Sequence, residues 1–137
     1  MSTQSFTEAL TAAWNSGNID RIAARYADDA VLDHVLFPEP LRGRAAIAQV
    51  EGGMFAAFSD IDWKVVNTVG GGDALALEWV VKATHTGEMP TPEGPLAPTG
   101  RRITIRGSSH MRLTQSGAIA SEHRYLDGAG MFAQLTG

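Results

Sequence analysis

The chain has 137 residues, of which 44% are hydrophobic and 19% charged, with a formal net charge of −4 at pH 7. This is the composition of an ordinary globular protein and predicts a single domain over residues 1–137. The scattered basic residues argue against nucleic-acid binding, the absence of cysteine excludes disulfides and thiolate metal sites, and no apolar run approaches the ~18 residues of a membrane span. We therefore expect a cytoplasmic protein with neither nucleic acid nor membrane as a partner.

Three amphipathic helices are predicted in the first part of the chain. The first has apolar residues at helical spacing from Phe6 to Trp14 and stops at Gly17. The second follows the N-cap residue Asn18 and carries its apolar stripe as far as Tyr26. The third runs on from Gly43 with a stripe formed by Ile47, Val50, Met54, Phe55 and Phe58.

The remaining elements are predicted to be strands. A short strand is expected over residues 30–36, before the Pro38-Glu39-Pro40 turn. Beyond Asp60 the apolar period changes to two, and four strand-like runs follow, at residues 61–69, 74–85, 101–114 and 118–126. Helices followed by a long meander predict an α+β fold, in which a cone-shaped, curved antiparallel β-sheet wraps around three N-terminal helices and encloses an apolar pocket.

Alternation along the strands predicts which side chains face that pocket. Trp79 and His85 fall in the apolar row of the second long run, and Ser109 and Met111 in that of the third. His110 falls on the opposite face.

In the first and last runs of the meander, alternation predicts less clearly which side chains face the pocket. In the first run, Trp63 and Asn67 fall on the same side. In the last run neither set is clearly apolar, so His123, Tyr125 and Asp127 share a face if the strand is regular, and one bulge near its end reverses that. The predicted substrate-binding residues are Trp14, Trp63, Trp79, His85, Ser109, Met111, His123 and Tyr125.

No cofactor or metal site is expected. The four histidines are dispersed, and no HxxxH, HExxH or DxDxDG pattern occurs. The Gly70-Gly71-Gly72 segment precedes a strand and lacks a following Lys-Ser/Thr pair, so it predicts a hairpin turn and not a phosphate loop.

Several local strings resemble the nuclear-transport-factor-like superfamily of cone-shaped domains and, within it, the SnoaL-like polyketide ester cyclases. The strings are Tyr26 to Val31, Gly43 to Ile47, His85 to Glu88, Pro98 to Arg102, Gly117 to Ile119, Tyr125 to Asp127, and Gln134-Leu135. The resemblance implies a homodimer that acts on a small apolar or aromatic polyketide-like substrate. It also implies a cofactor-free intramolecular aldol reaction with a carboxylate near the end of the last strand as acid and base, which by position is Asp127. The family's Glu-His-Trp string reads Glu122-His123-Arg124 here.

Two residues are candidates for the catalytic acid and base. Asp127 precedes Gly128-Ala129-Gly130 and is equally well explained as the N-cap of a short helix through Met131 and Leu135. His34 ends the first strand, where the ketosteroid isomerase branch of the superfamily places its base, and a histidine that is hydrogen-bonded at a strand end explains it as well.

Other functions within the superfamily stay open to different degrees. An isomerase would lack its donors, because Leu10 and Ser109 stand at the positions of the tyrosine acid and its partner aspartate. An epoxide hydrolase of the limonene type would lack the Arg-x-Asp pair on its middle strand. A dehydratase, another cyclisation and a non-catalytic small-molecule carrier remain as alternatives.

Overall fold

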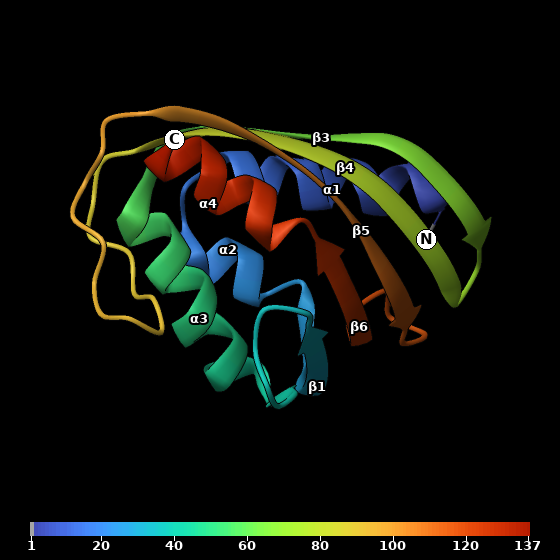
Figure 1. The fold of residues 1–137 in the computed structure, drawn as a ribbon. Coiled ribbons are helices and arrows are strands. Elements are labelled where there is room, and N and C mark those ends of the chain that lie inside the picture. The colour runs from blue at the N-terminus through green and yellow to red at the C-terminus, as the bar shows by residue number, and fades with distance from the viewer. Residues whose placement is uncertain (1) are drawn as a thin grey trace.

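The computed structural model describes residues 2–137. Its elements are α1 Thr3–Asn15, α2 Ile19–Ala23, β1 Tyr26–His34, β2 Leu41–Arg42, α3 Arg44–Ala57, β3 Phe58–Gly71, β4 Ala74–His85, β5 Arg102–Leu113, β6 Ile119–Leu126 and α4 Gly128–Thr136. The predicted α+β class is confirmed (Figure 1). Within residues 2–137, none of the helices combines the length and the apolar character that a membrane crossing requires.

Six strands form one curved sheet in the order β2-β1-β6-β5-β4-β3. Figure 1 shows the long strands β3, β4 and β5 arching over α1, with α2 and α3 below them. The sheet is not closed, because β2 and β3 are its two edges. The predicted arrangement of a curved sheet around N-terminal helices is confirmed.

The sheet differs from the prediction in one pairing, because β1 runs parallel to β6. Leu32 lies opposite Glu122, and His34 lies opposite Arg124. Short turns fix the directions of neighbouring strands in the meander, but most of the chain separates β1 from β6, so no hairpin constrains this pair. Since β4 and β6 are both antiparallel to β5, the strands β1, β4 and β6 all run in the same direction.

The end of α1 and the start of α2 lie where the sequence predicts. Gly17 has a φ of 68° after α1, and the side chain of Asn18 caps α2. The second helix is shorter than predicted, because it ends at Ala23 and Tyr26 already belongs to β1. Pairing of Tyr26 with Ile119 of β6 draws this segment into the sheet.

The C-terminal end of α3 is held by the segment that follows β4. The N–H groups of Thr86 and Gly87 both donate to the carbonyl oxygen of Ala57, at 3.0 Å. A Cβ atom at position 87 would clash with the carbonyl oxygen of Ala56, so this approach requires glycine. The end of β4 and the end of α3 are therefore fixed to each other.

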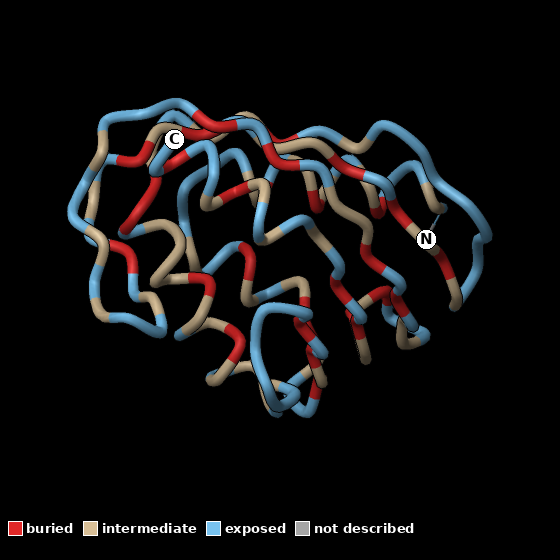
Figure 2. Tube along the Cα trace, viewed as in Figure 1, coloured by how far each residue is buried: buried red, intermediate tan, exposed pale blue. Residues whose placement is uncertain are grey.

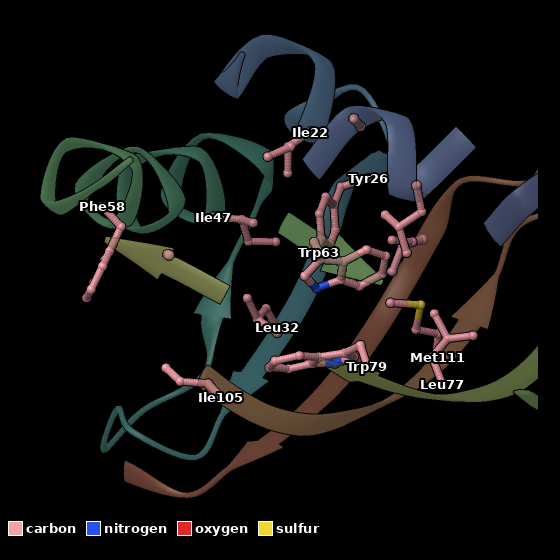
Figure 3. Close-up of a cluster of buried hydrophobic side chains, with 14 of the residues drawn as sticks. Ile22, Tyr26, Leu32, Ile47, Phe58, Trp63, Leu77, Trp79, Ile105 and Met111 are labelled. Carbon is pink, nitrogen blue, oxygen red and sulfur yellow. The ribbon is translucent and has the colours of Figure 1, made fainter. Parts of the chain in front are cut away.

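The predicted inner face of the sheet is confirmed for β4 and β5. The buried residues of the two strands alternate with more exposed ones (Figure 2). The buried residues of β4 are Leu75, Leu77, Trp79, Ala83 and His85. Figure 3 shows Trp63, Leu77, Trp79 and Met111 within the hydrophobic core, whereas His110 is exposed, as predicted.

The prediction that Asn67 shares the inner face with Trp63 is wrong. A register shift between Val65 and Asn67 adds a residue to β3 and reverses the facing of the side chains beyond it. Trp63 is buried, but Asn67 is exposed. Its Nδ2 donates to Oε1 of Glu78 on the outer face, at 2.9 Å.

Helix α4 continues the edge of β5 beyond the end of β6. The last register partner of β6 is Leu126, opposite Gly107. Further along β5, the backbone N–H of Thr104 donates to Oε1 of Gln134, and Nε2 of Gln134 donates to the carbonyl oxygen of Thr104, both at 2.8 Å. One amide side chain thus replaces a strand partner and attaches α4 to the sheet.

Candidate functional site

A cluster of buried charged residues lies in the interior between α3, β1 and β6, with Arg124 at its centre. Nε of Arg124 donates to Oε2 of Glu122 at 2.9 Å, and Nη1 donates to Oε1 of Glu51 at 2.5 Å. Nη2 donates to the hydroxyl oxygen of Tyr26 at 3.1 Å. All four residues are buried. The largely hydrophobic interior therefore also holds an ion-pair network, which the sequence did not predict.

The two carboxylates of this cluster have different partners. Glu122 accepts from Arg124 through both oxygens, and its Oε1 also accepts from the hydroxyl of Tyr26 at 2.5 Å. Glu51 accepts through Oε1 only, and within residues 2–137 no hydrogen bond reaches its Oε2. The cluster therefore leaves one carboxylate oxygen of Glu51 available to a further group.

The different surroundings separate the pKa values of the two carboxyl groups. Burial raises the pKa of Glu51, and the charge and hydrogen bond of Arg124 only partly offset this. Burial would also raise the pKa of Glu122, but the charge of Arg124 and the hydrogen bonds from Arg124 and Tyr26 outweigh it and lower that pKa. Separated pKa values of neighbouring carboxyl groups are typical of acid and base sites.

The backbone of β6 determines which side chains enter the cluster. Arg124 lies opposite Ser109 of β5, and Glu122 lies opposite Met111. Both β5 residues are buried on the inner face, as predicted. A register shift at the start of β6 allows Ile119 to face inward as well. Beyond this shift the even-numbered residues Glu122 and Arg124 face the interior.

The predictions that His123 and Tyr125 line the interior are wrong, because both lie on the outer face of β6. His123 lies opposite His110 and is 3.5 Å from the carboxylate of Asp33. Tyr125 is 50% exposed, and its ring contacts that of His110 edge to face, with 5.9 Å between centroids.

Asp127 is the N-cap of α4 and lies outside the interior. Its Oδ1 accepts the backbone N–H of Gly130 at 2.9 Å, and the residue is exposed. The sequence leaves Asp127 as either a catalytic residue or a helix cap, and the structure shows the cap. The expectation that its carboxylate faces the buried pocket is not met.

His34 faces the interior at the end of β1 and is buried. Its Nδ1 accepts the backbone N–H of Leu36 at 3.1 Å, so the proton of the neutral ring is on Nε2. Burial, and next the positive charge of Arg124, lower the pKa of His34 to about 4. The ring is therefore neutral at pH 7 and offers an N–H donor, whereas the sequence suggested a base.

His34→Asn should weaken the loss of stability in acid. Asparagine keeps an acceptor for the N–H of Leu36 but does not titrate. In the wild type the unfolded chain binds a proton near pH 6.5 and the folded protein only near pH 4, so the free energy of unfolding falls as the pH drops between these values. We expect the variant to lose less over this range, by on the order of 2 kcal/mol after solvent screening. Urea unfolding at pH 7 and pH 4.5 measures this, and equal losses in both proteins would contradict it.

Three of the predicted substrate-binding residues, Trp14, Trp63 and Trp79, form an aromatic wall beside the charge cluster. Trp14 of α1 stacks on Trp63 of β3 with 6.0 Å between centroids, and Trp63 stacks on Trp79 of β4 at 6.4 Å. Nε1 of Trp79 donates to Oγ of Ser109 at 3.0 Å. The guanidinium carbon of Arg124 lies 5.4 Å from the ring centroid of Trp14, so the wall and the cluster are continuous.

His85 is buried on the inner face at the end of β4, as predicted. It is 0% exposed, and its ring lies against Phe58 with 5.3 Å between centroids. In residues 2–137, no three His, Cys, Asp or Glu side chains are grouped so that they could hold a metal ion.

Two hollows open at other places on the surface. A broad one of about 770 Å³ lies over the outer face of the sheet, where Asn67, Glu78, Arg106 and Tyr125 contribute to its lining. A smaller one of about 320 Å³ lies near the N-terminus of α1. Neither is lined by a residue of the charge cluster.

Sequence reasoning missed the whole cluster, although two signals pointed to it. Glu51 follows Ile47 by four residues and shares the buried side of α3. Glu122 and Arg124 are two residues apart and hence on one face of β6. A carboxylate in an apolar stripe, together with an opposite-charge pair on one strand face, predicts a buried ion-pair network.

One family model matches nearly the whole chain. The family model described as SnoaL-like polyketide cyclase matches residues 4–135. A search of the curated proteins finds no match.

Solved structures with similar folds include IdmH from Streptomyces antibioticus, described as a proposed polyketide cyclase. It is 26% identical, with 96% of each chain covered and a TM-score of 0.77. AclR from Streptomyces galilaeus, a proposed hydroxylase, is 22% identical over 96% of this chain and 79% of its own, with a TM-score of 0.81. A protein of ketosteroid isomerase-like fold from Catenulispora acidiphila is 19% identical over 94% and 90% of the two chains, with a TM-score of 0.74.

Proposed function

The chain belongs to the SnoaL-like polyketide cyclase family, and on this premise we propose that it is a cofactor-independent cyclase that closes a ring in a polyketide-like ester by acid and base catalysis. The observation that carries the proposal is the buried carboxyl group of Glu51, whose pKa is raised by burial and whose Oε2 is available. A base for C–H chemistry needs a pKa raised toward the working pH. The adjoining tryptophans suit a flat, conjugated substrate.

In the proposed reaction Glu51 removes a proton from a carbon between two carbonyl groups. The electrons of the C–H bond move into the enolate, whose oxygen accepts a hydrogen bond from Nε2–H of His34. The enolate carbon then attacks a second carbonyl of the same molecule and forms the new C–C bond. The protonated Glu51 returns its proton to the resulting alkoxide, so the enzyme ends as it began.

The surrounding residues support these two roles. A neutral imidazole still carries one N–H. It can donate this N–H to the enolate oxygen and so stabilise the negative charge. Arg124 holds Glu51 at 2.5 Å and, with Glu122 and Tyr26, fixes its position. Such preorganised hydrogen bonds are often the largest contribution to catalysis.

A direct test of the base is hydrogen exchange in a simple ketone. We expect the protein to accelerate the exchange of the C1 protons of 2-tetralone in D2O, measured by NMR, above the rate in buffer alone. Exchange at the buffer rate would contradict base catalysis.

A test of ring closure uses a poly-β-keto methyl ester. An aldol cyclisation converts it to an isomer of the same mass, whereas a dehydratase gives a product lighter by one water. Mass spectrometry separates these results, and recovery of unchanged ester would contradict the proposed cyclase.

The second candidate is a non-catalytic small-molecule carrier. All three guanidinium nitrogens of Arg124 donate hydrogen bonds to residues of the protein. This is expected of a structural network and favours the carrier. A carrier binds 2-tetralone without accelerating exchange at C1, so the same NMR experiment distinguishes the two functions.

We also propose that the chain forms a homodimer through the outer face of the sheet. Val69 and Tyr125 are 62% and 50% exposed there, beside the broad hollow whose lining includes both Glu78 and Arg106. A two-fold interface brings the same patch of each copy together, so a patch that contains both charges can pair with itself.

Tyr125→Asp should therefore shift the protein from dimer to monomer, because it places a charge in the proposed interface. The mass in solution, measured by light scattering after size-exclusion chromatography, reports this. Gln4→Asp on the exposed side of α1 is the matched control and should remain dimeric. A monomeric wild type, or a dimeric Tyr125→Asp variant, contradicts the proposal.

A further inference from the structure

His85 lies where residues 85–88 meet residues 98–102, and contacts with both segments fix its ring. It ends β4 and opens the His85-Thr86-Gly87 segment, whose Thr86 and Gly87 hold the end of α3. The backbone of His85 pairs with the second segment, because its N–H donates to Arg101 and its carbonyl accepts from Gly100, both at 2.8 Å.

The imidazole of His85 is oriented by Thr99. The backbone N–H of Thr99 donates to Nδ1 at 3.1 Å, and its hydroxyl lies 3.0 Å from the same atom. Since Nδ1 accepts a backbone N–H, the proton of the neutral ring is on Nε2. The structure thus selects one tautomer and directs an N–H donor away from Thr99.

That donor has no partner in the part of the chain that the structure describes. Nε2 of His85 is buried and makes no hydrogen bond within residues 2–137, although the residue is 0% exposed. An unsatisfied buried N–H destabilises the folded state, and such groups in folded proteins call for a functional explanation or a bound water. Because contacts with residues 85–88 and 98–102 hold the ring with its Nε2–H unpaired, we favour a role for this N–H in ligand binding.

His85 is separate from the charge cluster. The β4 residue level with Arg124 is Leu77, through Ser109 of β5. His85 lies further along β4 by a stretch that spans roughly 26 Å of strand. Glu51 itself is nearer, because α3 places it six residues, about 9 Å of helix, before Ala57, to which Thr86 and Gly87 donate.

We propose that Nε2–H of His85 is a subsite for a carbonyl oxygen of the ligand. A neutral oxygen acceptor satisfies the unpartnered donor, and the apolar ring of Phe58 beside it suits the carbon skeleton around such a carbonyl. The choice of a ketone as ligand rests on the proposed function, but binding at His85 is measurable whether or not the protein catalyses a reaction. In a catalysed reaction His85 is a positioning residue, whose loss raises KM more than it lowers kcat.

The test compares 2-tetralone with tetralin, which lacks only the carbonyl oxygen. His85→Asn keeps an acceptor at the position of Nδ1 for Thr99 but has no atom at Nε2, whereas His85→Gln places an amide N–H near the position of Nε2. The wild type should prefer 2-tetralone by about tenfold, the worth of one hydrogen bond. The asparagine variant should lose this preference, and the glutamine variant should keep part of it.

Imidazole ¹⁵N NMR of the wild type gives a second measurement that needs no folded variant. Its Nε2 signal should be that of a protonated nitrogen and should shift with 2-tetralone but not with tetralin. A wild type that does not distinguish the ligands, including one that binds neither at millimolar concentration, overturns the subsite, as does a preference that persists unchanged in His85→Asn. Failure of the proposed cyclase instead appears as absent C1 exchange while 2-tetralone still binds.

Discussion

Glu51→Gln should reduce the exchange of 2-tetralone C1 protons, and any ring closure, by about 10²- to 10⁴-fold, which is the usual contribution of a positioned acid or base. Glutamine has nearly the shape of glutamate and keeps an oxygen for Nη1 of Arg124, so the fold should persist. Its amide cannot accept a proton at the working pH. Rates at saturating ketone, compared between wild type and variant with circular dichroism as the check on folding, measure the effect.

Asp127→Asn is the matched carboxylate-to-amide control. The resemblance alone assigns the acid and base role to Asp127, but the structure has it exposed and capping α4. Asparagine caps helices about as well as aspartate, so both stability and activity should be retained. Loss of activity in Asp127→Asn with full activity in Glu51→Gln would overturn our assignment and restore that of the resemblance.

The fold was largely predictable because its elements follow simple periodicities. The stripe of α3 and the alternation along β4 each bury one face, so helix, strand and inner row could be predicted before the structure. The failures arose where the chain departs from regular geometry. A bulge reversed Asn67, and a parallel partner far along the chain took Tyr26 out of its predicted helix.

The site was less predictable than the fold, because its meaning depends on contacts between distant residues. Trp14, Trp63 and Trp79 were predicted individually and do form one wall. Glu51 and Arg124 are 73 positions apart in the sequence. Each resembles an ordinary surface charge until it is known which side chains of β6 face the interior. The alternation of β6 was ambiguous because its inward residues are charged, which is the property that makes them of interest.

Arg124→Met should destabilise the protein by about 3–5 kcal/mol at pH 8, the usual cost of leaving buried carboxylates without their partner. Methionine fills much of the volume of the arginine stem but offers no donors. Glu122 loses the charge and hydrogen bonds of Arg124, which lower its pKa, and Glu51 loses the one donor it has within residues 2–137. Urea unfolding followed by tryptophan fluorescence measures the loss, and Trp14 beneath the guanidinium reports the local change.

The cost of Arg124→Met should shrink as the pH falls, which distinguishes lost charge pairing from lost packing. Without Arg124 the largest effect that lowers the pKa values of the two carboxyl groups is lost and burial raises them, so the folded variant binds protons at a higher pH than the unfolded chain does. Its stability relative to wild type therefore recovers toward pH 5. Adding Glu122→Gln to Arg124→Met removes one unpaired charge and should restore part of the stability at pH 8. A loss that is the same at both pH values and in the double variant would mean that Arg124 acts through packing on Trp14, and the ion-pair network would not be what holds Glu51 in place.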